Sequence, residues 1–385
     1  MIIQKAYYTY LSEKKIIWVV LFFLAIVIKL IFINNESADY YYFLNPWMTF
    51  INSNGFFDSL KYDFYNYTPS YIYILIAIAK LGLNPLYSIK IVSILFEYIL
   101  AFYIGKIAFL HSKNKSDFWI ALAIIPLVPS VLLNSVYWSQ CDSIYTTFIV
   151  GSIYYILKQK PFLSMVFLGL AFAFKLQTIF ILPFYFVLLL KGNIKWYSFF
   201  IIPIIYFASI IPAWLYGRTL TDLFSIYFSQ SSYYKELTMN FPNIYIWIDN
   251  IYYEKAKLLG LFFTGLITFI TGFWLKKSQY IITFESYIKL AFLSAIIIPY
   301  IMPGMHERYM YLGDVLGVLY FLVNHKNIHF PVGIAAVSFY SYIRCSRFNE
   351  ILPMSPAFVI YTLIIILASI DFVNSIKKSS NETDK

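Results

Sequence analysis

Residues 16–33 read IIWVVLFFLAIVIKLIFI, an apolar run that contains a single charge, Lys29. An α-helix needs about 20 predominantly apolar residues to cross the hydrocarbon core of a bilayer, so this run predicts a membrane span. It is too long for the core of a signal peptide, and it lacks a cleavage site of small residues. We therefore expect it to stay in the protein as the first span, with Lys14 and Lys15 on the cytoplasmic side.

The whole chain shares this apolar character. Of its 385 residues, 61% are hydrophobic and 12% are charged, and the mean hydropathy is +0.69. Soluble domains are about 45–50% apolar and about 25% charged, so the composition excludes an ordinary soluble enzyme and predicts an all-α polytopic membrane protein. The net charge of +10 comes from short clusters of Lys and Arg between apolar runs. Cytoplasmic retention of these clusters explains them without a nucleic-acid partner.

Alternating the apolar runs across the membrane gives about 12 crossings with both termini in the cytoplasm. After the first span, crossings are expected near residues 86–109, 118–136 and 143–157, in a hairpin over 162–190 with its tip at Lys175, in a span ending near Leu215, and near 258–275, 284–302, 309–323, 330–343 and 356–373. The run 69–83 is only about 15 residues long, so it is expected to be an interfacial helix. It belongs to a first outer loop at 34–85, and a second large outer loop covers 216–257. Residues 1–378 thus form one domain, and 379–385 form a disordered tail.

The unusual polar residues collect on the outer side of this arrangement. Residues 303–309 read PGMHERY and place three ionisable groups between two spans, where such groups are costly and are by default candidates for function. The guanidinium of Arg308 and the imidazole of His306 suit a phosphate oxygen, although an ion pair with Glu307 that closes a helix turn is the structural alternative. Lys175 interrupts an apolar run and is a second phosphate candidate, unless it extends to the interface. Three charges inside spans are expected to pair helices: Glu97, Lys289 and Asp371.

Asp39 begins the first outer loop and is a candidate general base. A carboxylate held in a partly dry cleft can take a proton from a hydroxyl, while the alternative is that Asp39 caps an interfacial helix. Asp142 fits the same description. Nearby aromatic residues suit sugar rings, or else anchor the chain at the interface; they include Tyr40, Trp47, Tyr67, Trp138 and Tyr309. No nucleotide-binding turn and no group of His or Cys at metal-binding spacing is found, so no metal is expected.

The order of these features resembles the GT-C superfamily of membrane glycosyltransferases, and more closely the bacterial relatives of the GPI-anchor mannosyltransferases. The resemblance covers residues 16–323. It rests on seven segments in order: Asp39-Tyr40, Pro46-Trp47, Gly55-Phe56, Asn66–Pro69, Trp138–Tyr145, Phe174–Gln177 and Met305–Tyr309. It implies a GT-C-like bundle of about 12 transmembrane helices with interfacial helices in the long first outer loop.

The resemblance also implies an activity. Such enzymes move a hexose, of mannose or glucose type, from a polyprenyl-phosphate carrier to an acceptor hydroxyl of a glycan or lipid, with inversion, on the outer face of a bacterial plasma membrane. The family's catalytic carboxylate corresponds to Asp39, whereas its frequent second acidic residue has no clear counterpart here. The reaction needs a base and a cationic cradle for the departing phosphate, and no cofactor. The cradle is expected from Arg308, Lys175 and His306, and substrate contacts are expected from Gln140, Asp142, Trp138, Tyr40, Tyr67, Gln177, Glu307 and Tyr309.

Two other functions fit the same composition. A flippase or transporter for lipid-linked saccharides would typically show inverted repeats and helices interrupted at the midplane, and we find no internal repeat in the sequence. A polysaccharide polymerase or ligase acting at the outer face would depend on Arg218 in the second outer loop rather than on Asp39.

Overall fold

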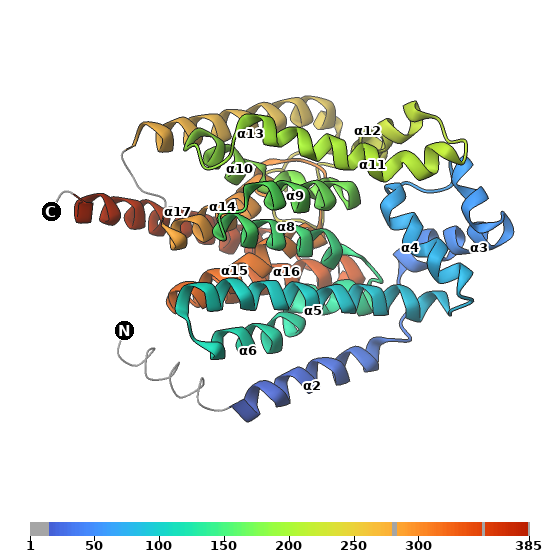
Figure 1. Ribbon diagram of the computed structural model, residues 1–385, viewed down its shortest axis with the longest axis horizontal. Coiled ribbons are helices and arrows are strands. Elements are labelled where there is room, and N and C mark those ends of the chain that lie inside the picture. Colours follow the sequence, from blue (N-terminus) through green and yellow to red (C-terminus); the bar gives the residue numbers. More distant parts are fainter. Residues whose placement is uncertain (1–14, 279–282, 349–350, 384–385) are drawn as a thin grey trace.

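The computed structural model describes residues 15–278, 283–348 and 351–383, and this part of the chain is almost entirely helical (Figure 1). The α-helices are α2 (Lys15–Phe32), α3 (Asn45–Ser53), α4 (Pro69–Lys80), α5 (Pro85–Ser112), α6 (Lys115–Ile124), α7 (Pro129–Leu132), α8 (Asp142–Leu157), α9 (Pro161–Phe174), α10 (Leu182–Leu190), α11 (Ile201–Leu215), α12 (Leu220–Tyr233), α13 (Tyr253–Lys277), α14 (Phe284–Ile301), α15 (Tyr311–Asn324), α16 (His329–Ile343) and α17 (Ser355–Thr383). Short 3-10 or π-helices are η1 (Tyr40–Leu44), η2 (Phe56–Lys61), η3 (Ile125–Leu127), η4 (Leu133–Tyr137), η5 (Leu176–Ile181), η6 (Trp196–Phe200), η7 (Asn250–Tyr252), η8 (Glu307–Met310) and η9 (Arg344–Phe348). Two short strands, β1 (Thr238–Met239) and β2 (Met305–His306), pair in parallel.

Five helical segments of the described chain are long and apolar enough to cross a membrane: Pro85–Ser112, Trp196–Leu215, Asn250–Lys277, Phe284–Ile301 and Ser355–Lys377. A sixth candidate is the pair Lys115–Leu127 and Pro129–Tyr137, which is bent by 57°. Pro126 and Pro129 lie at this bend, and each lacks the N–H that a continuous helix would use. These helices confirm an all-α membrane protein. The expected count of about 12 crossings exceeds the five or six that length and composition support, and it stays a prediction.

The internal boundaries follow the sequence closely. The break expected at Lys175 is confirmed, because this residue has extended backbone angles, φ −153° and ψ 138°, between α9 and η5. The short run expected at 69–83 forms the 12-residue helix α4, which begins at a proline. At the other end of the chain, α17 continues to Thr383, into the segment expected to be a tail. Residues 384–385 lie outside the described part.

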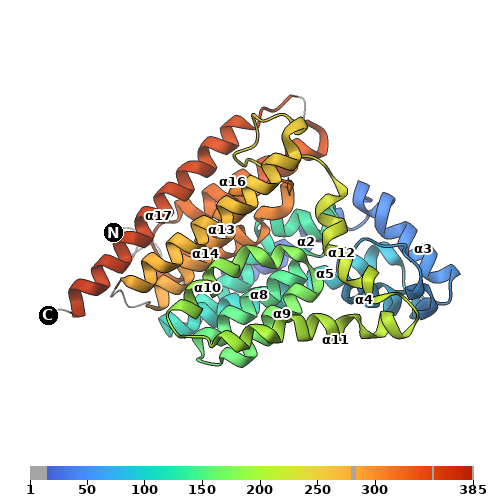
Figure 2. The same ribbon diagram turned by 90° about the horizontal axis from the view of Figure 1, so that it is seen from above.

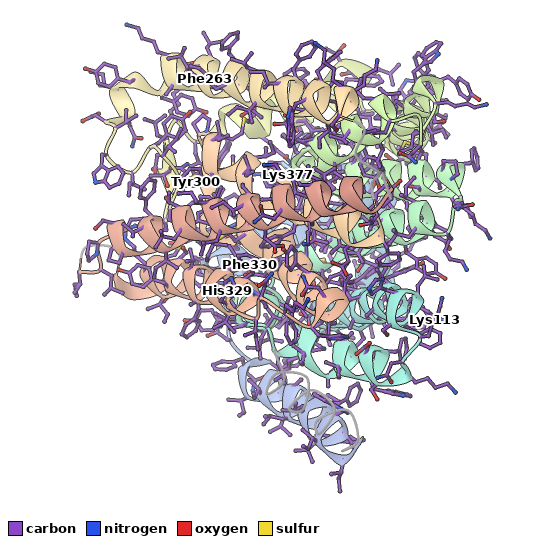
Figure 3. The ribbon with its side chains drawn as sticks, turned by 90° about the vertical axis from the view of Figure 1, so that its left-hand side faces the viewer. Lys113, Phe263, Tyr300, His329, Phe330 and Lys377 are labelled. Carbon is purple, nitrogen blue, oxygen red and sulfur yellow. The ribbon has the colours of Figure 1, made fainter. Side chains whose placement is uncertain are left out.

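Most of the long helices run beside one another along the long axis of the molecule, whereas α3, α4 and α12 gather at one end (Figure 1). Helix α17 ends toward the opposite end in both ribbon views (Figures 1 and 2). Helix α13 lies at an edge and points large apolar side chains outward, as Phe263 shows in Figure 3. Such a face suits lipid contact.

Close helix contacts and ion pairs between helices hold the bundle together. Gly151 of α8 lies against Phe167 of α9, since an added Cβ would be 2.5 Å from that ring. The Lys29 ammonium lies 2.5 Å from the Glu97 carboxylate and joins α2 to α5, and Lys289 lies 2.7 Å from the carboxylate of Asp371, which joins α14 to α17. The pairing role expected for Glu97, Lys289 and Asp371 is therefore confirmed.

Candidate active site

Asp39 lies directly before η1 and projects into a polar cleft. It occupies the N-cap position of η1, but its side chain makes no capping hydrogen bond, so the capping alternative fails. Its Oδ2 atom instead accepts a hydrogen bond of 2.6 Å from Gln140 Nε2 and lies 3.6 Å from Arg308 Nη1. Three segments that are far apart in the sequence thus meet at one carboxylate oxygen.

The turn that carries Gln140 is fixed by main-chain hydrogen bonds. The Gln140 N–H donates to the Asn134 carbonyl at 2.8 Å, and the Gln140 carbonyl accepts from the Ser93 hydroxyl at 2.8 Å. The side-chain Oε1 of Gln140 accepts from the Tyr67 hydroxyl at 2.9 Å. Because the amide oxygen faces Tyr67, the amide nitrogen faces Asp39 and can only donate to it.

The segment that carries Arg308 leaves α14 through Pro303 and Gly304. Gly304 has a φ of +76°, which favours glycine, and its N–H donates to the Leu237 carbonyl at 2.9 Å. The following residues form β2, whose pairing with β1 anchors the segment to the chain between α12 and α13. Arg308 Nη1 then reaches Glu307 Oε1 at 2.9 Å as well as Asp39.

These side chains line a cleft with a volume of about 300 Å³, which we call the polar cleft. Among the described residues, Arg308 is the only Lys or Arg in its lining, and Trp47, Tyr67 and Trp138 contribute aromatic rings. Its full lining is Ala38, Asp39, Phe43, Leu44, Trp47, Asn66, Tyr67, Trp138, Gln140, Tyr234, His306, Glu307, Arg308 and Cys345. A carboxylate, a guanidinium and aromatic walls around a space of this size can hold a sugar ring that carries an anionic group.

The charge state of the cleft follows from burial and from Arg308. Burial raises the pKa of Glu307, but the Arg308 guanidinium and, after it, the His306 ring, whose Nδ1 lies 3.7 Å from Glu307 Oε2, outweigh burial, so this pKa falls from 4.5 to about 2. Burial, and then Arg308, lower the pKa of His306 below 6.5, against the opposing pull of Glu307 and Asp39. At neutral pH, His306 is therefore uncharged and offers one N–H donor. The positive charge in the lining is that of Arg308.

Lys175 and Asp142 form a buried ion pair and do not line the polar cleft. The other oxygen of Asp142 accepts from Asn134 Nδ2 at 2.6 Å. The ammonium of Lys175 lies 5.4 Å from the centre of the Tyr67 ring, and the face of an aromatic ring attracts a cation. The pair therefore lies behind Tyr67, one layer away from the surface where Lys175 was expected to contact phosphate.

A second hollow, the side cavity, adjoins the polar cleft and has a volume of about 360 Å³. It lies between η5, α12, α13 and the segment 302–306, and its lining includes Gln177, Phe228, Leu261 and Tyr309. Tyr234 and His306 line both hollows, and their rings are 5.5 Å apart. Gln177 and Tyr309 are thus separated from Asp39 by His306.

Two other residues, and a larger hollow, lie away from the polar cleft. Tyr40 is buried in the apolar cluster around η1, α3 and α4 and lines neither hollow. Arg218 also lies outside both linings, where its guanidinium pairs with Asp63 and lies 4.3 Å from the centre of the Tyr65 ring. A larger hollow of about 430 Å³ between α2 and α6 is lined by apolar residues such as Trp18 and Trp119, and it offers no group for chemistry.

Sequence reasoning missed Tyr234, Cys345 and Asn134. Asn134 carried a usable signal, since it is an amide near the outer end of an apolar run. Tyr234 lies in a loop with many tyrosines, and nothing local distinguishes it. Cys345 is an isolated cysteine with no neighbouring motif, and it lines the polar cleft. Only the fold brings Tyr234 and Cys345 beside Glu307 and Arg308 in the lining of the polar cleft.

Comparisons of the chain with models of protein families, with curated proteins and with solved structures found no significant match. Function is therefore inferred from the fold and the polar cleft.

Proposed function

We propose that the protein is an inverting glycosyltransferase of the GT-C type, which moves a hexose from a polyprenyl-phosphate carrier to an acceptor hydroxyl. The observation that carries this proposal is the Asp39 carboxylate, held by Gln140 and 3.6 Å from Arg308 Nη1 in a cleft with aromatic walls. Transfer from a sugar phosphate requires a base at the acceptor hydroxyl and a cation at the departing phosphate, and the polar cleft contains one of each.

Each group in the cleft takes one part in the proposed reaction. Asp39 Oδ2 is occupied by Gln140, whereas Oδ1 makes no hydrogen bond to the described residues and receives the acceptor proton. The acceptor oxygen then bonds to the anomeric carbon, and the bond from that carbon to the phosphate oxygen breaks. The electron pair leaves with the carrier phosphate, whose charge Arg308 stabilises. Attack on the face opposite the phosphate inverts the anomeric centre.

The remaining residues orient the reactants. Neutral His306 donates its N–H to a phosphate oxygen beside Arg308, and the rings of Trp47, Tyr67 and Trp138 hold the sugar. Lys175 contributes through the Tyr67 ring rather than by direct contact with phosphate, because Asp142 already pairs with it. No metal is needed, since the carrier phosphate is itself the leaving group.

The position of the cleft agrees with a substrate that arrives from the membrane. The side cavity offers a largely apolar path next to His306 for the carrier chain. We place the end with α3, α4 and α12 on the outer face of a bacterial plasma membrane, with both termini cytoplasmic and about 12 crossings. The acceptor is a glycan or a lipid in the assembly of a cell-surface glycan.

The alternative functions have less support from the geometry. A polymerase or ligase that depends on Arg218 would need this residue at the site, whereas it pairs with Asp63 away from both hollows. A flippase for lipid-linked saccharides would need no base fixed by an amide, as Asp39 is.

The test is sugar transfer by the purified protein from a panel of polyprenyl-phosphate hexoses. Asp39→Asn should reduce turnover by about 10²- to 10⁴-fold, the range for a lost general base. Asp222→Asn makes the same chemical change on the exposed surface of α12 and should behave as wild type. Full activity of Asp39→Asn would remove Asp39 as the base. No transfer from any donor by the folded wild type would favour the flippase or the ligase.

A further inference from the structure

The C-terminal end of α2 is held by a lysine from another helix. Lys90 lies in the second turn of α5, and its side chain is fully buried. Its ammonium donates to the carbonyls of Phe32 at 3.2 Å, Ile33 at 2.9 Å and Asn35 at 2.5 Å. An ammonium has three N–H bonds, and each one finds an acceptor here. The last carbonyls of a helix lack partners within the helix and carry partial negative charge, which this cation complements.

The same short segment is also tied to the turn that carries Gln140. Asn35 Nδ2 donates to the Tyr137 carbonyl at 2.9 Å, and the Ser37 hydroxyl donates to the Trp138 carbonyl at 2.7 Å. The main chain between α2 and η1 is therefore fixed by α5 on one side and by residues 137–138 on the other. Asp39 follows two residues after Ser37.

We infer that Lys90 is a positioning residue: it clamps the end of α2 to α5 so that Asp39 meets Gln140 and Arg308. This inference rests on the proposed function, because it assigns Lys90 a part in the same transfer. Lys90 does not line the polar cleft and touches no substrate.

The charge of Lys90 has a reason beyond packing. A buried ammonium is costly, and an apolar side chain of similar volume would join α2 to α5 without that cost. What an apolar side chain cannot supply is a donor for three carbonyls at once. Without this donor, the Ile33 and Asn35 carbonyls lose their hydrogen bond from Lys90, and the Phe32 carbonyl keeps only the Asn35 N–H at 3.0 Å. The segment would therefore rearrange toward other donors, and Asp39 would move with it.

The experiment compares Lys90→Met with Lys90→Arg and with Lys106→Met. Methionine keeps an unbranched side chain and removes the charge. Lys106 lies on the same helix, its ammonium lies over the Phe102 ring, and it is distant from the cleft in sequence. Lys90→Met should lower kcat by about 100-fold, the scale expected for a displacement of about 1 Å at a reacting group, with the KM for the donor nearly unchanged. Lys90→Arg should be intermediate, and Lys106→Met should match wild type.

Amide hydrogen exchange supplies a second readout that needs no activity. Residues 35–41 should exchange faster in Lys90→Met, while residues 305–311 stay as in wild type. This local change in a protein whose wild type transfers no sugar would support the clamp and reject the proposed function. Wild-type kcat, or unchanged exchange at 35–41, would overturn the inference. A loss of kcat with faster exchange along the whole chain would show a merely structural role and would overturn it too.

If Lys90→Met does not fold, Lys90→Arg decides the question. It keeps the charge but not the arrangement of three donors on one nitrogen. Reduced kcat together with faster exchange confined to residues 35–41 supports the clamp, and wild-type behaviour in both measurements overturns it.

Discussion

Gln140→Leu should slow sugar transfer more than Tyr67→Phe, because it removes both side-chain hydrogen bonds of Gln140, including the one to Asp39, whereas Tyr67→Phe removes only the bond between Tyr67 and Gln140. Gln140 Nε2 donates to the Asp39 carboxylate at 2.6 Å, and the Tyr67 hydroxyl donates to Gln140 Oε1 at 2.9 Å. A hydrogen bond to a charged group contributes about 1.5–3 kcal/mol, and one between neutral groups contributes about 0.5–1.5 kcal/mol. At about 1.4 kcal/mol for each factor of ten, the expected losses are about 12- to 140-fold for the bond to Asp39 and about 2- to 12-fold for the bond from Tyr67.

A single-turnover assay with a labelled polyprenyl-phosphate hexose measures the chemical step apart from product release. Because Tyr67 reaches Asp39 through Gln140, the double variant should be no slower than Gln140→Leu alone. Tyr73→Phe is the matched control, since the Tyr73 hydroxyl donates to the Ser209 carbonyl at 2.9 Å outside the polar cleft.

Two results would refute this reasoning. Equal losses of rate from Gln140→Leu and Tyr67→Phe would show that the hydrogen bond to the Asp39 carboxylate contributes nothing to the chemical step beyond the bond from Tyr67. A loss in the double variant equal to the product of the single losses would show that the two residues act independently, so that Gln140 does not transmit the effect of Tyr67 to Asp39.

Two further predictions concern stability, measured by thermal unfolding in detergent. The pKa of Glu307 falls from 4.5 to about 2, so its ionised carboxylate should contribute on the order of 3 kcal/mol to the free energy of unfolding. This contribution is present above about pH 4.5 and is lost as the pH falls toward 2. Glu307→Gln should therefore be less stable than wild type at pH 7, and a difference in stability that persists at pH 2 would contradict this cause. Lys29→Met should cost about 3–5 kcal/mol because it leaves Glu97 as a buried charge without its partner. The double change Lys29→Met with Glu97→Leu should recover most of this loss, and equal instability of the single and double variants would exclude the unpaired charge as the reason.

The sequence predicted most helix boundaries because prolines and lysines interrupt the apolar runs where the helices end. It also predicted that Asp39, Gln140 and Arg308 lie near one another, since all three follow the ends of apolar runs assigned to one face. The number of crossings could not be predicted in the same way. Helix α8 has 16 residues and α9 has 14, which is short for a bilayer. A helix covered by other helices is apolar whether or not it crosses.

The partners of buried charges were the least predictable part of the site. Lys175 and Asp142 were both placed at the outer face, but nothing in the sequence says that they neutralise each other rather than face a substrate. Lys90 stands in an apolar run, and its three acceptors are main-chain carbonyls. Carbonyls occur at every residue, so no residue pattern reveals this contact. The way the helices pack determines which groups a buried charge meets.

The polar cleft also sets an order of events during biosynthesis. Asp39 and Gln140 are made early, and Arg308 is added 269 residues after Asp39. At about 5–20 residues per second, the ribosome needs roughly 13 to 54 s to cover that interval. A nascent chain therefore carries its carboxylate into the membrane long before the guanidinium and the β1–β2 pairing that anchors it exist. Until the chain up to Cys345 has been made, the growing polypeptide has no complete polar cleft.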